Sequence, residues 1–335
     1  MQKIYDPEHY KIVFFSSAPI GVPFLEALHN DKRFDITGVV TMPDAPSGRG
    51  MKMQENVIKT TAKKYSFDVQ TPNSLHHEST KYGNEAKEFQ QRLTNKKPDF
   101  LVVIAYGKII PQAILDIPRL APINVHGSVL PKYRGASPIQ SVFLHDEKET
   151  GITIMKMATW LDTGDMIDMQ NFVIPFDRTA KDIIEKMQAI WPYFLAETLW
   201  KYGKWLLWEV AQDEKKATLC GKIEKEDALI DPWKDSITSI YQKYRAYILW
   251  PKVYFMHKGK RVIIDELVLD EKIFEQNKYQ PLVISQQIPH PVLEAGKLRG
   301  APFIKWELHP AVKKCTVKPE GSTSQSWDDF VKGYL

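Results

Sequence analysis

The sequence has few cysteines and no long apolar run. Its two cysteines, Cys220 and Cys315, lie far apart without the spacing of a metal or redox motif, so no disulfide framework is expected. The apolar stretches are too short or too charged to cross a bilayer. The N-terminus mixes Lys3, Asp6 and Glu8 before its first apolar run, unlike a secretory signal peptide. These absences predict a cytoplasmic protein with reduced thiols.

The chain also lacks a strong excess of charge and the glycine pattern of a dinucleotide site. Its 45 basic and 41 acidic residues leave a net charge of +4, so contact with a nucleic acid would have to come from local basic patches. The turn after the first predicted strand reads Ser16-Ser17-Ala18-Pro19 and contains no G-x-G-x-x-G. Its sequence therefore argues against a nicotinamide cofactor at that position.

Short apolar runs alternate with amphipathic segments over the first two hundred residues. Strands are predicted at 11–15, 34–41, 100–105, 121–123, 152–157 and 172–174, and helices at 22–28, 55–65, 85–93, 136–145 and 179–202. This order favours an α/β fold with a Rossmann-like, doubly wound parallel sheet that is buried on both faces. Ligands of such sheets bind at the carboxyl ends of the strands.

The 335 residues are enough for one large core and a second, smaller one. Charged residues and short strands replace helices near 208–217, so we predict a first domain at 1–207, a linker at 208–222 and a second domain at 223–335. The second domain shows one helical segment and several short strands, which predict a small β-barrel. These segments are 237–244 for the helix and 253–257, 261–269, 281–285 and 302–308 for the strands.

The most informative stretch runs from Asn124 to Gly135 and reads NVHGSVLPKYRG. An apolar run leads into it, so Asn124 and His126 should lie at the end of a strand. Alternation along a strand puts residues two apart on the same face, so this amide and this imidazole can be directed at one substrate atom. Glycines and a proline then turn the chain into a loop at the sheet edge. A second polar loop, Leu-Asp-Thr-Gly-Asp at 161–165, follows another predicted strand.

Each of these pieces alone has an ordinary structural interpretation. A single histidine at a strand end more often makes a structural hydrogen bond than it catalyses, and Asn124 alone suits a turn. The combination is rare: Asn-x-His-Gly-Ser-x-Leu-Pro-x-Tyr-Arg-Gly followed by Leu-Asp-Thr-Gly-Asp resembles the 10-formyltetrahydrofolate-dependent formyltransferases. The resemblance implies that Asn124, His126 and Asp162 form the catalytic set and that no metal takes part.

The resemblance covers roughly residues 11 to 260 and implies two binding regions. The residues implied for the folate donor are Ser128, Val129, Leu130, Pro131, Ala105, Tyr106 and Gly107. The stretch 43–53 is rich in proline and glycine, which predicts an exposed loop rather than a helix or strand. Its Gly-Arg-Gly resembles the family's loop that enters the acceptor end of initiator tRNA, so Arg49 and Lys52 are expected to contact tRNA. The second domain is implied to be an oligonucleotide-binding (OB) type barrel that binds tRNA.

Formyl transfer between two nitrogens needs a neutral acceptor amine, a stabilised oxyanion and a proton carried to the departing nitrogen. Asn124 can donate to the oxyanion, and His126 can bind the same oxygen or take the amine proton. Asp162 can orient His126 and favour its charged form, or act through a water. The resemblance implies direct transfer of the formyl group from 10-formyltetrahydrofolate, a co-substrate, to the amino group of methionine on initiator tRNA. A monomer is expected.

Four alternative functions stay open from the residues alone. A sugar-nucleotide N-formyltransferase would use the same three residues, and a formyltetrahydrofolate hydrolase would share the donor and the catalytic set. A non-catalytic RNA-binding module would need only the barrel and Arg49, but the intact catalytic set weighs against it. A metal hydrolase would draw on His126, His145, Asp146, Asp162 and Asp165. No pair among these has the spacing of a metal-binding motif.

Overall fold

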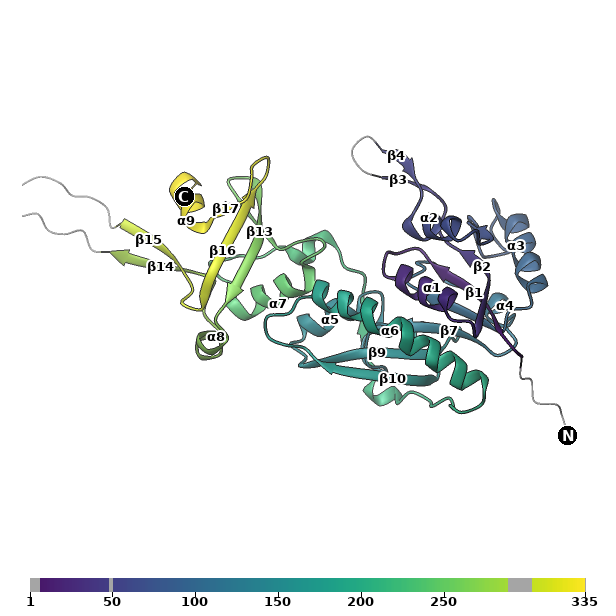
Figure 1. Cartoon of the computed structure of the whole chain (residues 1–335). Coiled ribbons are helices and arrows are strands. Elements are labelled where there is room, and N and C mark those ends of the chain that lie inside the picture. Colours follow the sequence, from purple (N-terminus) through teal and green to yellow (C-terminus); the bar gives the residue numbers. More distant parts are fainter. Residues whose placement is uncertain (1–6, 48–50, 289–302, 335) are drawn as a thin grey trace, which may run out of the picture. The chain divides into compact units, whose positions relative to one another are not determined.

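The computed structural model of the chain describes residues 7–47, 51–288 and 303–334, and these residues form two compact units (Figure 1). The first unit contains the described residues up to 138, together with 149–172 and 184–221. The second contains 139–148, 173–183 and the described residues from 222 onward. The residues predicted as a linker thus belong almost entirely to the first unit, while the domain boundaries at 207 and 223 remain a prediction.

A seven-stranded sheet forms the centre of the first unit, in the order β10-β9-β7-β6-β1-β2-β5. Its strands are β1 (Tyr10–Ser16), β2 (Phe34–Val40), β5 (Val69–Gln70), β6 (Phe100–Ile104), β7 (Ala121–His126), β9 (Glu149–Lys156) and β10 (Met166–Val173). The five strands from β7 to β5 in that order pair in parallel, and β9 runs antiparallel to β7. The prediction of an α/β fold with a mainly parallel sheet is confirmed.

The strand order reverses between β1 and β6, because the chain proceeds from β1 through β2 to β5 on one side and from β6 to β7 on the other. A ligand crevice is expected at the carboxyl ends of the strands beside such a reversal. The ends of β1 and β6 are joined there by a hydrogen bond from the Ser17 amide to the Ala105 carbonyl, 3.2 Å long. The fold therefore directs attention to the edge where β1, β6 and β7 end.

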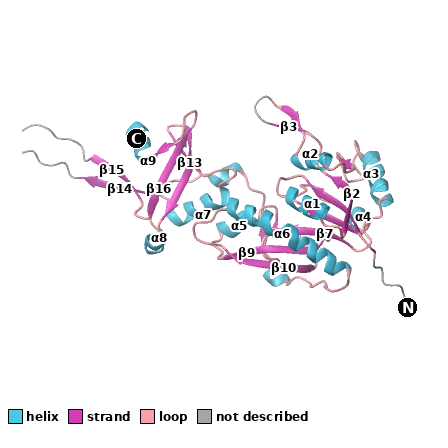
Figure 2. Cartoon of the chain, in the orientation of Figure 1, coloured by secondary structure: helices cyan, strands magenta, loops and turns pink. Residues whose placement is uncertain are grey.

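The helices of the first unit are α1 (Gly21–Asn30), α2 (Val57–Lys64), α3 (Gly83–Asn95), α4 (Gln112–Leu115) and α6 (Ala180–Gly203), whose first residues belong to the second unit. The apolar spacing that predicted α1 buries Phe24, Leu25 and Leu28. Asn56 caps α2 by accepting from the Lys59 amide at 3.1 Å. Full burial of an apolar side chain as large as Phe24 or Leu25 stabilises the folded state by roughly 1.5–3 kcal/mol. Figure 2 shows these helices packed beside the strands.

The stretch 43–53 departs from its predicted loop structure. Strands β3 (Ala45–Ser47) and β4 (Lys52–Gln54) pair antiparallel as a hairpin, with Ala45 opposite Gln54. Pro46 is tolerated because a two-stranded ribbon has only edge strands, where a missing amide hydrogen costs little. Composition rich in proline and glycine thus predicted irregular structure where the chain makes a short ribbon.

The second unit contains helices α5 (Pro138–Leu144, from residue 139 on), α7 (Ile237–Tyr247), α8 (Glu271–Asn277) and α9 (Trp327–Tyr334). An antiparallel sheet has the order β12-β13-β16-β17, formed by β12 (Tyr254–His257), β13 (Lys260–Leu269), β16 (Val312–Pro319) and β17 (Gln325–Ser326). A separate hairpin joins β14 (Val283–Ile288) and β15 (Phe303–Leu308). A closed OB-type barrel remains a prediction.

Local sequence explains part of this unit. Lys258 and Gly259, between β12 and β13, have φ angles of 46° and 75°, the left-handed geometry of a two-residue hairpin turn. Arg245 of α7 is buried, and its guanidinium donates to the carbonyls of Arg178 (2.7 Å) and Pro175 (3.0 Å). This buried arginine explains why residues 173–183 pack with the second unit. No helix within the described residues is both long and apolar enough to cross a membrane.

Candidate functional site

Asn124 and His126 lie at the C-terminal end of strand β7, which is placed between β6 and β9 in the sheet. Asn124 pairs with Val103 of β6, and His126, the final residue of β7, pairs with Thr153 of β9. His126 is only 4% exposed. The strand therefore presents the amide and the imidazole at the carboxyl edge of the sheet, as their spacing predicts.

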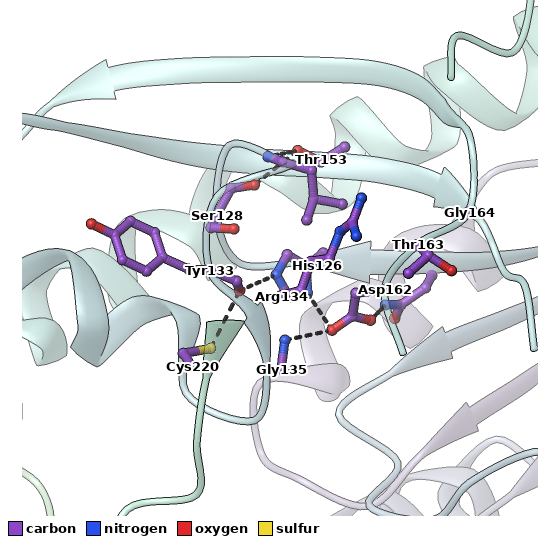
Figure 3. Close-up of polar contacts among 12 residues, drawn as sticks. His126, Ser128, Tyr133, Arg134, Gly135, Thr153, Asp162, Thr163, Gly164 and Cys220 are labelled. Carbon is purple, nitrogen blue, oxygen red and sulfur yellow. Dashed lines mark hydrogen bonds and ion pairs between the residues drawn. The ribbon is translucent and has the colours of Figure 1, made fainter. Parts of the chain in front are cut away.

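Asp162 lies in the loop between β9 and β10 and approaches both side chains. Figure 3 shows it beside His126. One carboxylate oxygen accepts from the Asn124 amide at 3.4 Å. The other accepts from the backbone amide of Gly135 at 2.8 Å and lies 3.5 Å from Nδ1 of His126. Asp162 has a φ of 53°, a left-handed conformation that aspartate tolerates better than most residues. The structure thus brings Asn124, His126 and Asp162 together, although 38 residues separate Asn124 from Asp162.

The hydrogen bonds of His126 determine which ring nitrogen can take a proton. Nε2 lies 2.9 Å from the carbonyl oxygen of Tyr133. A carbonyl can only accept, so Nε2 carries a hydrogen and Nδ1 of the neutral ring is the acceptor that faces Asp162. Burial lowers the pKa of His126, while the charge of Asp162 and the Tyr133 carbonyl act in the opposite direction. Burial has the larger effect, so the pKa of His126 is lowered overall, whereas the carboxylate beside Nδ1 favours the protonated ring.

The loop predicted to contact folate, residues 128–131, is held by hydrogen bonds within the loop and to strand β9. The hydroxyl of Ser128 donates to the Lys132 carbonyl at 2.7 Å, so its side chain serves the loop. Thr153 of β9 donates to the Ser128 carbonyl (2.8 Å) and accepts from the Leu130 amide (3.1 Å). Leu130 is buried and Pro131 follows it through a cis peptide bond. Folate contact by Ser128, Val129, Leu130 and Pro131 remains a prediction.

The turn at 105–107, also predicted for folate, divides into exposed and buried parts. Ala105 and Gly107 are exposed, and Ala105 has a φ of 46°. Tyr106 is buried and its ring packs edge to face on Phe15, with 5.4 Å between centroids. The Tyr106 side chain therefore belongs to the core, and only Ala105 and Gly107 can border a ligand with exposed atoms.

The residues predicted to contact tRNA lie in the β3–β4 hairpin. Arg49 falls outside the described residues. Lys52 is exposed at the start of β4, between the exposed side chains of Met51 and Met53. Its role in tRNA binding remains a prediction.

Several residues that support the site escaped the sequence analysis as functional candidates. Gly135 and Tyr133 act through their backbone, on Asp162 and His126 respectively. Gln212 donates to the carbonyls of Asp162 (2.8 Å) and Gly164 (2.7 Å). Tyr133 and Gly135 belong to the Tyr-Arg-Gly motif, which could have marked them as functional. Gln212 lies 50 residues after Asp162 and belongs to no motif.

Across the described parts of the chain, no group of three or more His, Cys, Asp or Glu side chains is placed to hold a metal ion. The side chains that meet at the end of β7 are an amide donor, a buried imidazole and a carboxylate. Such a set can stabilise an oxyanion and move a proton.

Comparisons with known proteins agree with this chemistry. The family model for formyl transferase matches residues 10–199, and the model for the formyl transferase C-terminal domain matches residues 222–335. A methionyl-tRNA formyltransferase from Caldicellulosiruptor saccharolyticus is 34% identical over 323 residues, which cover 96% of each chain.

Two solved structures share the fold at low sequence identity. A methionyl-tRNA formyltransferase from Clostridium thermocellum superposes with a TM-score of 0.55 at 15% identity, covering 78% of this chain and 94% of that one. An N-formyltransferase from Helicobacter canadensis, crystallised with folinic acid and dTDP-3-aminofucose, gives a TM-score of 0.58 at 19% identity, covering 78% and 88%. With both domain models matched and a relative aligned over nearly its whole length, the chain belongs to the formyl transferase family.

Proposed function

We propose that this protein transfers the formyl group of 10-formyltetrahydrofolate to the amino group of methionine on initiator tRNA. The observation that carries the proposal is the meeting of Asn124, His126 and Asp162 at one edge of the sheet. The near full-length similarity to a methionyl-tRNA formyltransferase supports the choice of acceptor. The protein acts in the cytoplasm as a monomer and uses the folate as a co-substrate.

The reaction joins the methionine nitrogen to the formyl carbon and then breaks the bond from that carbon to the folate nitrogen. The Asn124 amide donates to the oxyanion of the tetrahedral intermediate, and one such donor is worth about 3–4 kcal/mol in a transition state. The amide carries two hydrogens, so it can keep its bond to Asp162 while it donates to the substrate.

The proton lost by the amine must reach the departing folate nitrogen. His126 is suited to take it at Nδ1, because Nε2 is already engaged with the Tyr133 carbonyl. The carboxylate of Asp162, 3.5 Å from Nδ1, stabilises the imidazolium that forms. The same proton then passes to the leaving nitrogen, so no covalent enzyme intermediate is needed.

The acceptor is recognised by regions outside this cluster. Arg49 and Lys52 contact the acceptor end of initiator tRNA, and the C-terminal domain binds the tRNA body. The 105–107 turn, through its exposed residues Ala105 and Gly107, and the 128–131 loop border the folate. Replacing Arg49 with alanine is expected to weaken discrimination for initiator tRNA and to leave folate binding unchanged.

The direct test measures formyl transfer from 10-formyltetrahydrofolate to three acceptors: methionine-charged initiator tRNA, methionine-charged elongator tRNA and a dTDP-amino sugar. The proposal expects initiator tRNA to be formylated with the highest kcat/KM. Formylation of the amino sugar alone would instead identify a sugar-nucleotide N-formyltransferase. Release of free formate without any acceptor would identify a hydrolase.

A further inference from the structure

The segment 212–220 lies between the two matched family domains, which end at residue 199 and begin at residue 222. Strand β11 (Leu219–Cys220) pairs in parallel with β8 (Arg134–Gly135). Thr218, just before β11, binds the residues at the start of β8. Its carbonyl accepts from the Arg134 amide and its hydroxyl accepts from the Tyr133 amide, each at 2.8 Å. The segment therefore holds residues 133–135 along their whole length.

Residues 133–135 are the ones that contact two catalytic side chains through the backbone. The Tyr133 carbonyl binds Nε2 of His126, and the Gly135 amide binds the carboxylate of Asp162 (Figure 3). A Cβ at Gly135 would lie 2.0 Å from the Cys220 carbonyl oxygen. The close approach shows that this position is set by direct contact with β11.

Gln212 makes a second connection, to the backbone of the catalytic aspartate. Its side-chain nitrogen donates to the Asp162 and Gly164 carbonyls, and its oxygen accepts from Nε of Arg134 at 3.0 Å. Gln212 is 9% exposed, so water cannot easily replace these bonds. Asp162 has a left-handed backbone, which costs of order 1 kcal/mol or more and persists only where surrounding contacts hold it.

Arg134 keeps the Gln212 amide in the orientation that these bonds require. Arg134 is 4% exposed and pairs through both terminal nitrogens with Glu214, at 2.9 and 2.7 Å. Its Nε can only donate, so the Gln212 oxygen must face it and the Gln212 nitrogen must face the loop. The direction of the amide, and with it the placement of Asp162, follows from this buried guanidinium.

We propose that Gln212 is a positioning residue of the formyl transfer reaction: held by Arg134, it places Asp162 against His126 and Asn124, which makes the segment between the family domains part of the active site. The inference rests on the catalytic roles given under the proposed function. Gln212 lies against backbone carbonyls, so it acts through Asp162 rather than on the substrate.

The decisive variant is Gln212→Glu, which keeps the oxygen that accepts from Arg134 and replaces the donor nitrogen with a second oxygen. A carboxylate cannot donate to the two carbonyls, so the loop should shift. Displacement of a catalytic group by about 1 Å can cost about 100-fold in rate. We expect kcat to fall 10- to 100-fold while the KM values for tRNA and folate change less than about twofold.

The positioning role also predicts a pH dependence of kcat for Gln212→Glu, measured where the variant stays fully folded. Protonation of the new glutamate restores one donor, so the ratio of Gln212→Glu to wild-type kcat should rise as the pH is lowered. Gln212→Met removes both functions without adding a titrating group and should show the same loss with no such recovery. Gln91→Glu makes the same chemical change on an exposed position of α3 and should match the wild type.

Raised KM values with normal kcat, or a rate loss that follows only the fraction of unfolded protein, would overturn the proposal. An activity-independent readout separates it from the proposed function: the ring ¹⁵N resonances of His126, assigned with His126→Gln. They should move in Gln212→Glu and Gln212→Met but not in Gln91→Glu. If the wild type fails to formylate initiator tRNA, the proposed function falls, whereas unmoved His126 resonances would refute the positioning role alone.

Discussion

Replacing Asp162 with asparagine removes the negative charge beside His126 and preserves the size of the side chain. Nδ1 of His126 lies 3.5 Å from the Asp162 carboxylate. At an effective dielectric constant of about 20, Coulomb's law gives about 5 kcal/mol for unit charges at that separation. Neighbouring dipoles and water will offset part of this energy. We therefore expect kcat to fall by roughly 100- to 1000-fold, equivalent to about 3–4 kcal/mol of transition-state stabilisation.

The same variant should change the pH dependence in a defined direction. Burial lowers the pKa of His126, and the charge of Asp162 counteracts that effect. Without the charge, burial acts with less opposition and the pKa of His126 falls further. The acidic limb of the kcat/KM profile should therefore move to lower pH, because the histidine stays neutral in more acidic solution.

Steady-state formyl transfer between pH 5 and 9 would measure both effects. Asp165→Asn, in the same loop, is the matched control and should leave the rate and the profile close to those of the wild type. In Asp162→Asn the side-chain oxygen can still accept from the backbone amide of Gly135, so the fold should be kept. Circular dichroism can check this. A rate within threefold of the wild type, or an acidic limb that moves upward, would refute the role given to Asp162.

Three further predictions follow from the same contacts. Asn124→Ala should lower kcat about 100-fold with little change in either KM, since it removes an oxyanion donor; single-turnover kinetics would measure this, and a defect confined to KM would contradict it. When the pH is lowered from 7 to 5, the free energy of unfolding measured in urea should fall less for His126→Gln than for the wild type. The lowered pKa of His126 means that the unfolded chain binds more protons below its ordinary value of 6.5, so wild-type stability falls with the pH through that window. Thr153→Val should reduce the free energy of unfolding by about 1–3 kcal/mol, because it leaves the Leu130 amide and the Ser128 carbonyl without their partner; an unchanged urea midpoint would show that this bridge contributes nothing.

Local patterns in the sequence carried much of the fold and of the candidate site. The period of two along β7 placed Asn124 and His126 on one face, because strand geometry is the same wherever a strand forms. Apolar spacing located α1 and β1 for a similar reason. The long strand β16 (Val312–Pro319) was missed, since two consecutive exposed lysines, Lys313 and Lys314, interrupt its alternation.

Side-chain direction was less predictable than backbone position. Tyr106 was predicted to border the folate with its neighbours, yet its ring enters the core against Phe15. The hairpin at 45–54 replaced a predicted loop, because pairing between β3 and β4 supplies hydrogen bonds that proline and glycine content does not reveal. Both outcomes depend on which segment packs beside the residue, and composition does not report that.

The sequence by itself determined the α/β class, the strand that bears the amide and the imidazole, and the family, because each depends on short-range order and residue identity. Only the tertiary structure decided that Gln212 and Arg134 meet across 78 residues to hold the loop of Asp162. The reason is physical: such contacts arise from the parallel pairing of β8 with β11 and from one left-handed backbone angle, and neither leaves a periodic trace along the chain.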